Sequence, residues 1–229
     1  SGPQDRNETL MGHKPFLVIS DYLTRRGIAV LRFDDRGTAE SGGNFGSATT
    51  ADFATDVEAA VSYLHTRKQI IAGRVGLVGH SEGGLIAAMV AAMDKHIDFI
   101  VMLAGPGLTG EQVLLTQQAA IAKAMGVPTE AIARQQQGNE KAFRLITEVS
   151  DTTALKDSLS SLIEASLPRQ LSEAQREKAV SRSLSQLTSP WMRYFLKTDP
   201  SVYLKKVSCP VLALDGTHDL QVLPGQNIP

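Results

Sequence analysis

The chain has 229 residues, 42% of them hydrophobic, which is enough to bury the core of one large α/β domain or of two small ones. Lysine and arginine (23) balance aspartate and glutamate (24), so the net charge is −1, and no overall positive field favours nucleic acid or an anionic membrane as a partner. No stretch approaches the ~18 consecutive apolar residues of a membrane span, and a single cysteine excludes an internal disulfide.

The first half of the chain alternates helix and strand. Hydrophobic spacing predicts helices over residues 15–23, 49–64 and 85–93, and apolar runs predict strands over residues 28–31, 74–78 and 99–104. The clearest helix begins at Thr49, because Asp52 three residues later completes a capping-box pattern. Alternation of this kind requires a parallel sheet with helices on both faces, whose active site lies at the carboxyl ends of the strands.

The amino-acid composition changes in the second half of the chain. Residues 111–196 are rich in Gln, Ala, Ser, Glu and Lys and contain no clear strand, which predicts a helical insertion of several segments. Gly126 and Pro128 break it once, and Ser172 with Gln175 forms another capping-box pattern. The alternation then resumes with a predicted strand over residues 209–214.

The stretch GHSEGG, residues 79–84, carries the strongest chemical signal. It follows a predicted strand and precedes an apolar helix, and its G-x-S-x-G spacing is typical of a turn that exposes a nucleophilic serine, Ser81. Gly79 and Gly83 would let the backbone turn sharply without Cβ clashes. The Glu82 N–H, at the start of the helix, would then stabilise an oxyanion. The alternative is an ordinary glycine-rich turn, which does not require serine at its apex.

Four stretches together resemble the α/β-hydrolase superfamily, in particular its serine esterase and S33-type aminopeptidase-like branch. They are SGPQDRNE, DDRGTAESGG, GHSEGG and LALDGTHDLQV. In the second, Ala39 replaces the family's usual second glycine. The resemblance implies a doubly wound, mostly parallel sheet with an inserted helical cap. It divides the chain into a first core part (1–108), the cap (109–196) and a continued core (197–229).

The resemblance also implies roles for individual residues. The triad acid is Asp219, three residues after Gly216, with Asp215 as its rival. The second oxyanion donor is the N–H of Gly2 or of Gln4, since proline lies between them. In two further stretches, Asp5-Arg6 and Asp34-Asp35-Arg36, the charged residues are expected to form ion pairs that stiffen loops around the site.

The family order is serine, acid, histidine, yet no histidine follows Asp219. The five present, His13, His65, His80, His96 and His218, fit the role of base poorly, and His80 is expected to point into the sheet. The resemblance therefore implies a chain truncated at both ends.

The expected activity is that of a serine hydrolase that cleaves small neutral carboxylic esters through an acyl-enzyme intermediate. An amidase or aminopeptidase with the same triad, and a catalytically inactive binding module, are the alternatives. No metal motif and no phosphate-binding glycine loop occurs in the sequence, so no cofactor or metal is expected. The expected partner is a small-molecule ester.

Overall fold

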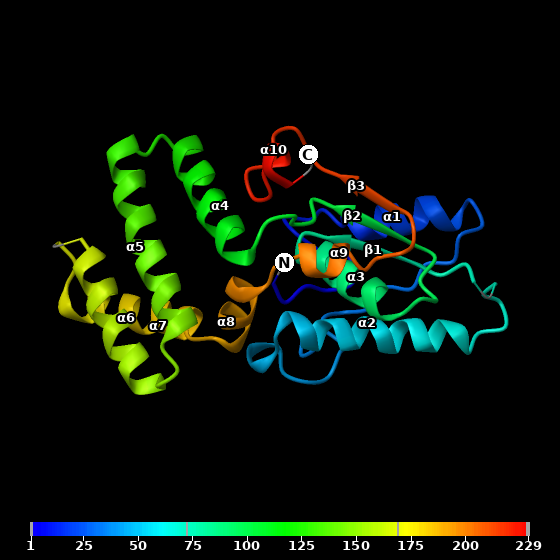
Figure 1. Cartoon of the computed structure of the whole chain (residues 1–229), viewed down its shortest axis with the longest axis horizontal. Coiled ribbons are helices and arrows are strands. Elements are labelled where there is room, and N and C mark those ends of the chain that lie inside the picture. The colour runs from blue at the N-terminus through cyan, green and yellow to red at the C-terminus, as the bar shows by residue number, and fades with distance from the viewer. Residues whose placement is uncertain (1, 72, 169, 228–229) are drawn as a thin grey trace. The chain divides into compact units, whose positions relative to one another are not determined.

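The computed structural model describes residues 2–71, 73–168 and 170–227, and it divides into two compact units. One unit contains residues 2–105 and 202–214, and the other contains residues 106–201 and 215–227. Figure 1 labels the elements of both. The second unit includes residues 109–196, predicted as a helical insertion, and also the segment after residue 214.

The first unit is built on a parallel sheet. Its described strands, β1 (Gly76–His80), β2 (Phe99–Leu103) and β3 (Val211–Leu214), lie in the order β1-β2-β3. The register pairs Gly79 with Met102 and Met102 with Ala213. Because β2 is paired on both sides, it is the central strand of the three, and the carboxyl ends of all three strands lie at the same edge.

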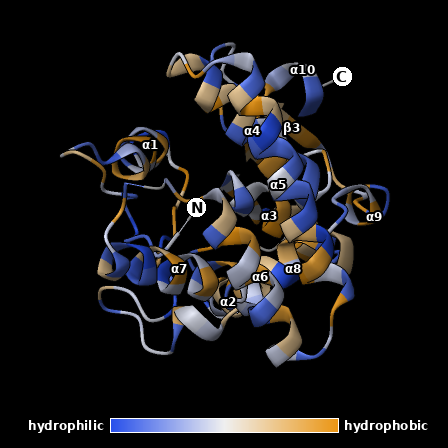
Figure 2. Cartoon of the chain, turned by 90° about the vertical axis from the view of Figure 1, so that its left-hand side faces the viewer, coloured by the Kyte–Doolittle hydropathy of each residue, from blue (hydrophilic) through white to orange (hydrophobic). Residues whose placement is uncertain are grey.

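Two helices cover this sheet in layers. α3 (Glu82–Met93) packs against β1 and β2, and α2 (Thr50–His65) packs against α3. α3 is apolar on every side and almost wholly buried, as expected for a helix enclosed between a sheet and a second helix; it is coloured as hydrophobic in Figure 2. α2 begins with the predicted capping box between Thr49 and Asp52.

The prediction of a strand over residues 28–31 is wrong, because these residues belong to no β-ladder among the described strands. Ile28 and Leu31 are exposed, although their apolar sequence predicted burial. An apolar run becomes a strand only when a neighbouring strand satisfies its backbone groups. The helix before it is present as α1 (Pro15–Thr24), with proline at its first position.

The described residues of the second unit form five helices of eight residues or more. They are α4 (Gly110–Ala124), α5 (Thr129–Glu148), α6 (Thr152–Ser166), α7 (Glu173–Leu187) and α8 (Pro190–Lys197). Consecutive helices from α4 to α7 pack against each other, and α8 packs against α4, α5 and α7. They enclose a separate apolar core that contains Phe143, Ile146 and Leu159. Figure 2 shows the hydrophilic and hydrophobic residues mixed along α5 that such packing requires.

The remaining elements are short: the 3₁₀ helix η1 (Phe45–Ser47), α9 (Ser201–Leu204) and α10 (Pro224–Asn227). The Asn227 side chain accepts hydrogen bonds from the N–H groups of Gly107, at 2.8 Å, and Leu108, at 3.3 Å. These contacts connect the segment after β3 to the start of the insertion. Within the described part of the chain, none of the helices has the length and apolar character needed to cross a membrane.

Candidate active site

Ser81 occupies the turn between β1 and α3. Its backbone has φ 53° and ψ −122°, a conformation that residues with a side chain rarely adopt because Cβ crowds the backbone. Its N–H donates to the Leu103 carbonyl at 2.9 Å, and its own carbonyl accepts the Gly84 N–H at 2.9 Å. The predicted strained strand-to-helix turn is therefore present, and it is held from both the sheet and the helix.

The two glycines that flank Ser81 differ in their surroundings. A Cβ on Gly79 would lie 2.0 Å from the Gly83 carbonyl oxygen, which is far too close for any side chain. A Cβ on Gly83 would meet no described atom within 4 Å. The sequence pattern suggested that both positions need glycine for steric reasons, and the structure corrects this, because only Gly79 is crowded.

The residue after the serine is anchored inside the unit. The Glu82 side chain is buried, and its Oε1 accepts a hydrogen bond from Thr50 Oγ1 at 2.6 Å. Thr50 is itself fully buried at the start of α2. This bond connects α2 to the residue whose N–H is the predicted oxyanion donor. Sequence reasoning missed Thr50; the signal was the acidic residue inside G-x-S-x-G, which needs a donor once it is buried.

The two candidates for the second oxyanion donor are placed differently. The Gln4 N–H donates to Asp35 Oδ2 at 2.9 Å, and the Asp35 N–H donates to the Gln4 carbonyl at 3.0 Å. The Gln4 amide is therefore already engaged, which counts against its predicted role. The Gly2 N–H makes no hydrogen bond with any described residue, so Gly2 is the better candidate of the two.

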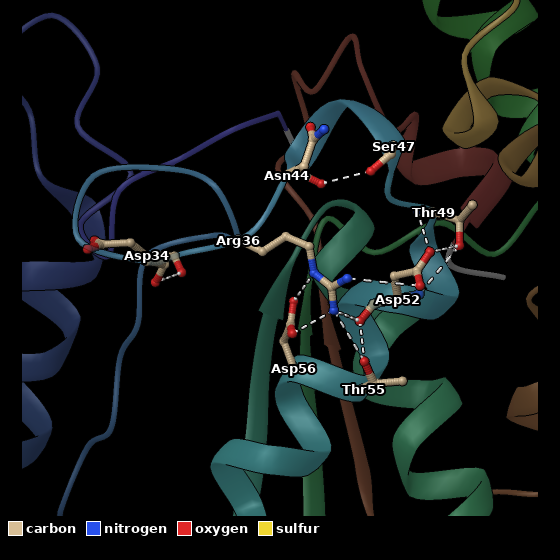
Figure 3. A network of polar contacts seen from close by, with 9 residues as sticks. Asp34, Arg36, Asn44, Ser47, Thr49, Asp52, Thr55 and Asp56 are labelled. Atoms are coloured by element: carbon tan, nitrogen blue, oxygen red, sulfur yellow. Dashed lines mark hydrogen bonds and ion pairs between the residues drawn. The ribbon is translucent and has the colours of Figure 1, made fainter.

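Ion pairs stiffen the neighbouring loops. The Arg6 N–H and Nε donate to Asp34 Oδ1 at 2.7 and 2.9 Å, and the Arg6 side chain lowers the pKa of Asp34 well below its usual range. The Arg36 side chain instead forms a bidentate ion pair with Asp56 at 2.7 and 2.8 Å. Figure 3 shows Arg36 turned toward α2, away from Asp34. Ala39 lies in the same loop with φ 46°, a region that favours glycine.

Asp35 lies in an acidic environment. Burial is the main cause that raises its pKa, the Gln4 amide opposes this, and the negative charges of Glu82 and Glu8 add to the increase. The negative charges of Glu82, which follows Ser81, and of Glu8 therefore both act on Asp35. Such a setting disfavours a negatively charged substrate group.

The segment after β3 holds the two candidate acids. The Asp219 N–H donates to the Gly216 carbonyl at 2.9 Å, and Asp219 Oδ1 accepts the N–H groups of Gln221 and Val222 at 2.7 and 3.0 Å. Asp219 is thus fixed in a local turn. Asp215 has both carboxyl oxygens buried, with no hydrogen-bond donor among the described residues.

His80 and His96 of the first unit pair with acidic residues. His80 Nδ1 lies 3.1 Å from Glu8 Oε1, and the half-exposed ring also contacts Phe16. The expectation that His80 points into the sheet is therefore wrong. His96 Nδ1 lies 2.9 Å from Asp94. Within residues 2–71 and 73–105, no histidine hydrogen-bonds to Ser81.

No cluster of three or more His, Cys, Asp or Glu residues is placed to hold a metal ion in the described parts of the chain.

Comparisons with known proteins identify a family and several similar proteins. The model of the X-Pro dipeptidyl-peptidase family (S15 family) matches residues 3–228. The esterase EstD of Thermotoga maritima is 33% identical over 117 residues, which cover 51% of this chain and 28% of that esterase. The match thus spans little more than a quarter of this curated relative.

Solved structures resemble the fold. The α/β hydrolase GrgF from Penicillium sp. sh18 has a TM-score of 0.59 at 16% identity and covers 98% of this chain and 72% of its own. A hypothetical protein, PA2218 from Pseudomonas aeruginosa, has a TM-score of 0.52 at 17% identity, with coverages of 89% and 64%. These neighbours and the parallel sheet confirm the predicted α/β-hydrolase fold.

Proposed function

Because the chain belongs to the X-Pro dipeptidyl-peptidase (S15) family and has the α/β-hydrolase fold, we propose that it is a serine hydrolase. Its proposed nucleophile is Ser81, and its proposed substrates are small neutral carboxylic esters. Asp219 is the proposed triad acid, and the N–H groups of Glu82 and Gly2 are the proposed oxyanion donors. The similarity to the esterase EstD supports ester cleavage.

The observation that carries this proposal is the backbone of Ser81. An ordinary glycine-rich turn would place glycine at a position with φ 53°, because a side chain is strained there. Strain of this kind is retained where it contributes to function. At this turn it presents a hydroxyl at the N-terminal end of α3, where helix amides stabilise negative charge.

In the proposed reaction, a histidine base removes the Ser81 proton as Oγ attacks the acyl carbon. The carbonyl π-electrons move to the oxygen, and the Glu82 and Gly2 amides donate to that oxyanion. The intermediate then collapses and expels the alcohol, which takes its proton from the imidazolium. Water repeats the sequence on the acyl-enzyme and releases the acid. Asp219 would accept the imidazole N–H throughout and fix its tautomer.

Two features support a neutral substrate with a small acyl group. The charges of Glu82 and Glu8 both act on Asp35, and these acidic groups would repel an anionic group. The cap predicted over residues 109–196 supplies apolar side chains, including Met125 and Trp191, for an acyl or alkyl group.

The first test is covalent labelling of the natural full-length protein by a fluorophosphonate. The label should attach to Ser81 and disappear in Ser81→Ala, while Ser47→Ala, at an exposed position, should label like wild type. Asp219→Asn should lower kcat by about 10⁴, by analogy with the triad template. Labelling that survives in Ser81→Ala would refute the nucleophile assignment.

A second function, aminopeptidase or dipeptidyl-peptidase, is favoured by the family match. It uses the same triad, and the acidic groups beside Ser81 would suit a substrate with a free amine. The two are separated by comparing nitrophenyl acetate, butyrate and laurate with aminoacyl and X-Pro nitroanilides. We expect the short esters to react fastest. Faster cleavage of an anilide than of every ester would favour the peptidase.

A catalytically inactive binding module is the third reading. It predicts neither labelling of Ser81 nor turnover of any substrate in the panel. Recruitment of His218 as the base would show as turnover that His218→Ala abolishes.

A further inference from the structure

The buried hydrogen bond between Thr50 and Glu82 lies next to Ser81 in the chain, yet the steps of the proposed reaction do not use it. Glu82 directly follows Ser81, and its side chain is buried. Burying a carboxyl group is costly unless a donor replaces the water that it loses, whereas an apolar side chain at the same position would carry no such cost. Thr50 is fully buried and supplies such a donor, with 2.6 Å between its Oγ1 and Glu82 Oε1.

The Thr50 hydroxyl is held in place by the start of α2. Thr50 is the first residue of this helix and directly follows Thr49, which forms the capping box with Asp52. Arg36 donates to the Asp52 carbonyl at 2.9 Å, so this turn of the helix is also fixed from the preceding loop (Figure 3). The Glu82 carboxyl group that binds here lies at the N-terminal end of α2, where helix amides favour negative charge.

The backbone on either side of Glu82 is fixed by two further hydrogen bonds. The Ser81 N–H donates to the Leu103 carbonyl on β2, and the Gly84 N–H donates to the Ser81 carbonyl, each at 2.9 Å. Thr50 adds a contact through the Glu82 side chain. An oxyanion donor benefits from such anchoring, because catalysis depends on amides that already point to the place where charge develops.

We propose that Thr50 is a positioning residue for the proposed hydrolysis. Its hydroxyl holds the Glu82 side chain and, through it, the orientation of the Glu82 N–H toward the oxyanion. This role in turnover rests on the proposed function, in which the Glu82 N–H is an oxyanion donor, whereas the anchoring of the turn does not. The first turn of α2 thereby helps to set the geometry of the turn that bears Ser81.

The first test compares two variants of Thr50 in the natural full-length protein, with nitrophenyl butyrate as the substrate. Thr50→Val keeps a side chain of similar size without the hydroxyl. It should lower kcat about tenfold, the lower end of the range for one hydrogen bond to a charged group, with KM nearly unchanged. Thr50→Ser keeps the donor and should restore most of the loss. An unchanged kcat in Thr50→Val, or equal losses in both variants, would contradict the positioning role.

The matched control is Val61→Ala, because Val61 is buried on the same helix. This variant removes apolar contacts and leaves the Thr50 hydroxyl in place, so it should lower the Tm without changing kcat. A loss of kcat in Val61→Ala as large as that in Thr50→Val would show that turnover follows the stability of α2, and the proposal would be overturned.

The second test does not depend on turnover. Hydrogen exchange, followed by NMR, compares the Gly84 amide, which is bonded across Glu82, with the Ser81 amide, which is bonded to β2. In Thr50→Val the Gly84 amide should exchange several-fold faster relative to the Ser81 amide, and in Thr50→Ser the ratio should match that of wild type. An unchanged ratio in Thr50→Val would refute the anchoring. If the wild-type protein hydrolysed no ester, the proposed function would fail, but this ratio would still decide whether Thr50 holds the turn.

Discussion

At the scale of single residues, the crowding around Gly79 distinguishes it from Gly83. Gly79→Ala would place a methyl group 2.0 Å from the Gly83 carbonyl oxygen, which belongs to the backbone and cannot rotate away. We expect this variant to lose more than about 3 kcal/mol of unfolding free energy, at the upper end of overpacking effects.

The matched variant is Gly83→Ala, which adds the same methyl group to open space in the first turn of α3. It should be neutral or up to about 1 kcal/mol more stable, because alanine favours the helix. Urea denaturation of both variants measures the difference. Similar losses in both would show that the crowding at Gly79 is relieved by small backbone shifts.

Asp34 and Asp35 are adjacent, yet their pKa values move in opposite directions. The Arg6 side chain lowers the pKa of Asp34. The charge of Asp34 therefore stabilises the fold above the unfolded pKa of about 4, and this contribution is lost as the pH falls through the folded pKa. Burial raises the pKa of Asp35. Ionisation of Asp35 therefore destabilises the fold as the pH rises above the same unfolded pKa.

Asp34→Asn should therefore lower the Tm at pH 7, and Asp35→Asn, which keeps an acceptor for the Gln4 amide, should raise it. Both differences should shrink toward pH 3, where the wild-type carboxyl groups approach protonation in the unfolded chain. Calorimetry at the two pH values checks this. A decrease at pH 7 in both variants would contradict the assignment for Asp35.

At the scale of elements, Arg36 connects the loop of residues 34–48 to α2. Its Nε and Nη2 bond both oxygens of Asp56, and Nη2 also donates to the Asp52 carbonyl at 2.9 Å (Figure 3). Arg36→Lys cannot reproduce this planar arrangement. Because the pair is partly exposed, we expect a loss of only about 1 kcal/mol.

The loop should respond more than the overall stability does, with faster amide exchange over residues 37–48 in Arg36→Lys. The control is Arg25→Lys, which alters an exposed ion pair with Asp21 on α1 and should change stability by less than about 0.5 kcal/mol. Unchanged exchange in the Arg36 variant would show that the loop is held by other contacts.

At the scale of the whole molecule, the two units have separate cores. We therefore expect that the unfolding of each unit can be monitored by itself. Trp191, the single tryptophan, packs against the core of the second unit and stacks on Phe195 at 4.8 Å between ring centroids. Leu159→Ala leaves a cavity at a fully buried position of that core. It should cost about 2–5 kcal/mol, as other leucine truncations do.

The cost should appear as a lower denaturation midpoint in Trp191 fluorescence. Lys156→Ala, at an exposed position on the same helix, is the control and should leave the midpoint unchanged. A Trp191 midpoint that does not move in Leu159→Ala would mean that the described cluster does not determine the stability of this unit.

Much of the fold could be predicted from local patterns. The capping boxes at Thr49 and Ser172, and the serine and proline that begin α8, mark real helix starts, because capping depends on neighbouring residues alone. The apolar run at residues 28–31 led to a wrong strand prediction. Strand pairing depends on distant strands, and the sequence of the run does not show whether such a partner is present.

The candidate site was predictable in outline only. The spacing around Ser81 indicated a strained turn, which the structure contains. The bond from Thr50 to Glu82 and the engagement of Gln4 by Asp35 were not predicted, since each joins residues about 30 positions apart whose approach depends on the tertiary fold. For the same reason, the orphaned carboxyl group of Asp215 had no sequence signal.

The bond from the Ser81 N–H to the Leu103 carbonyl has a consequence for hydrogen exchange. Leu103 ends β2, the strand paired on both sides, so this amide can meet solvent only when the centre of the sheet opens. Its exchange should therefore be among the slowest in the first unit and should track global unfolding rather than local motion. Ser81, attached in this way, keeps its backbone geometry until the sheet itself is lost, however much the surrounding loops move.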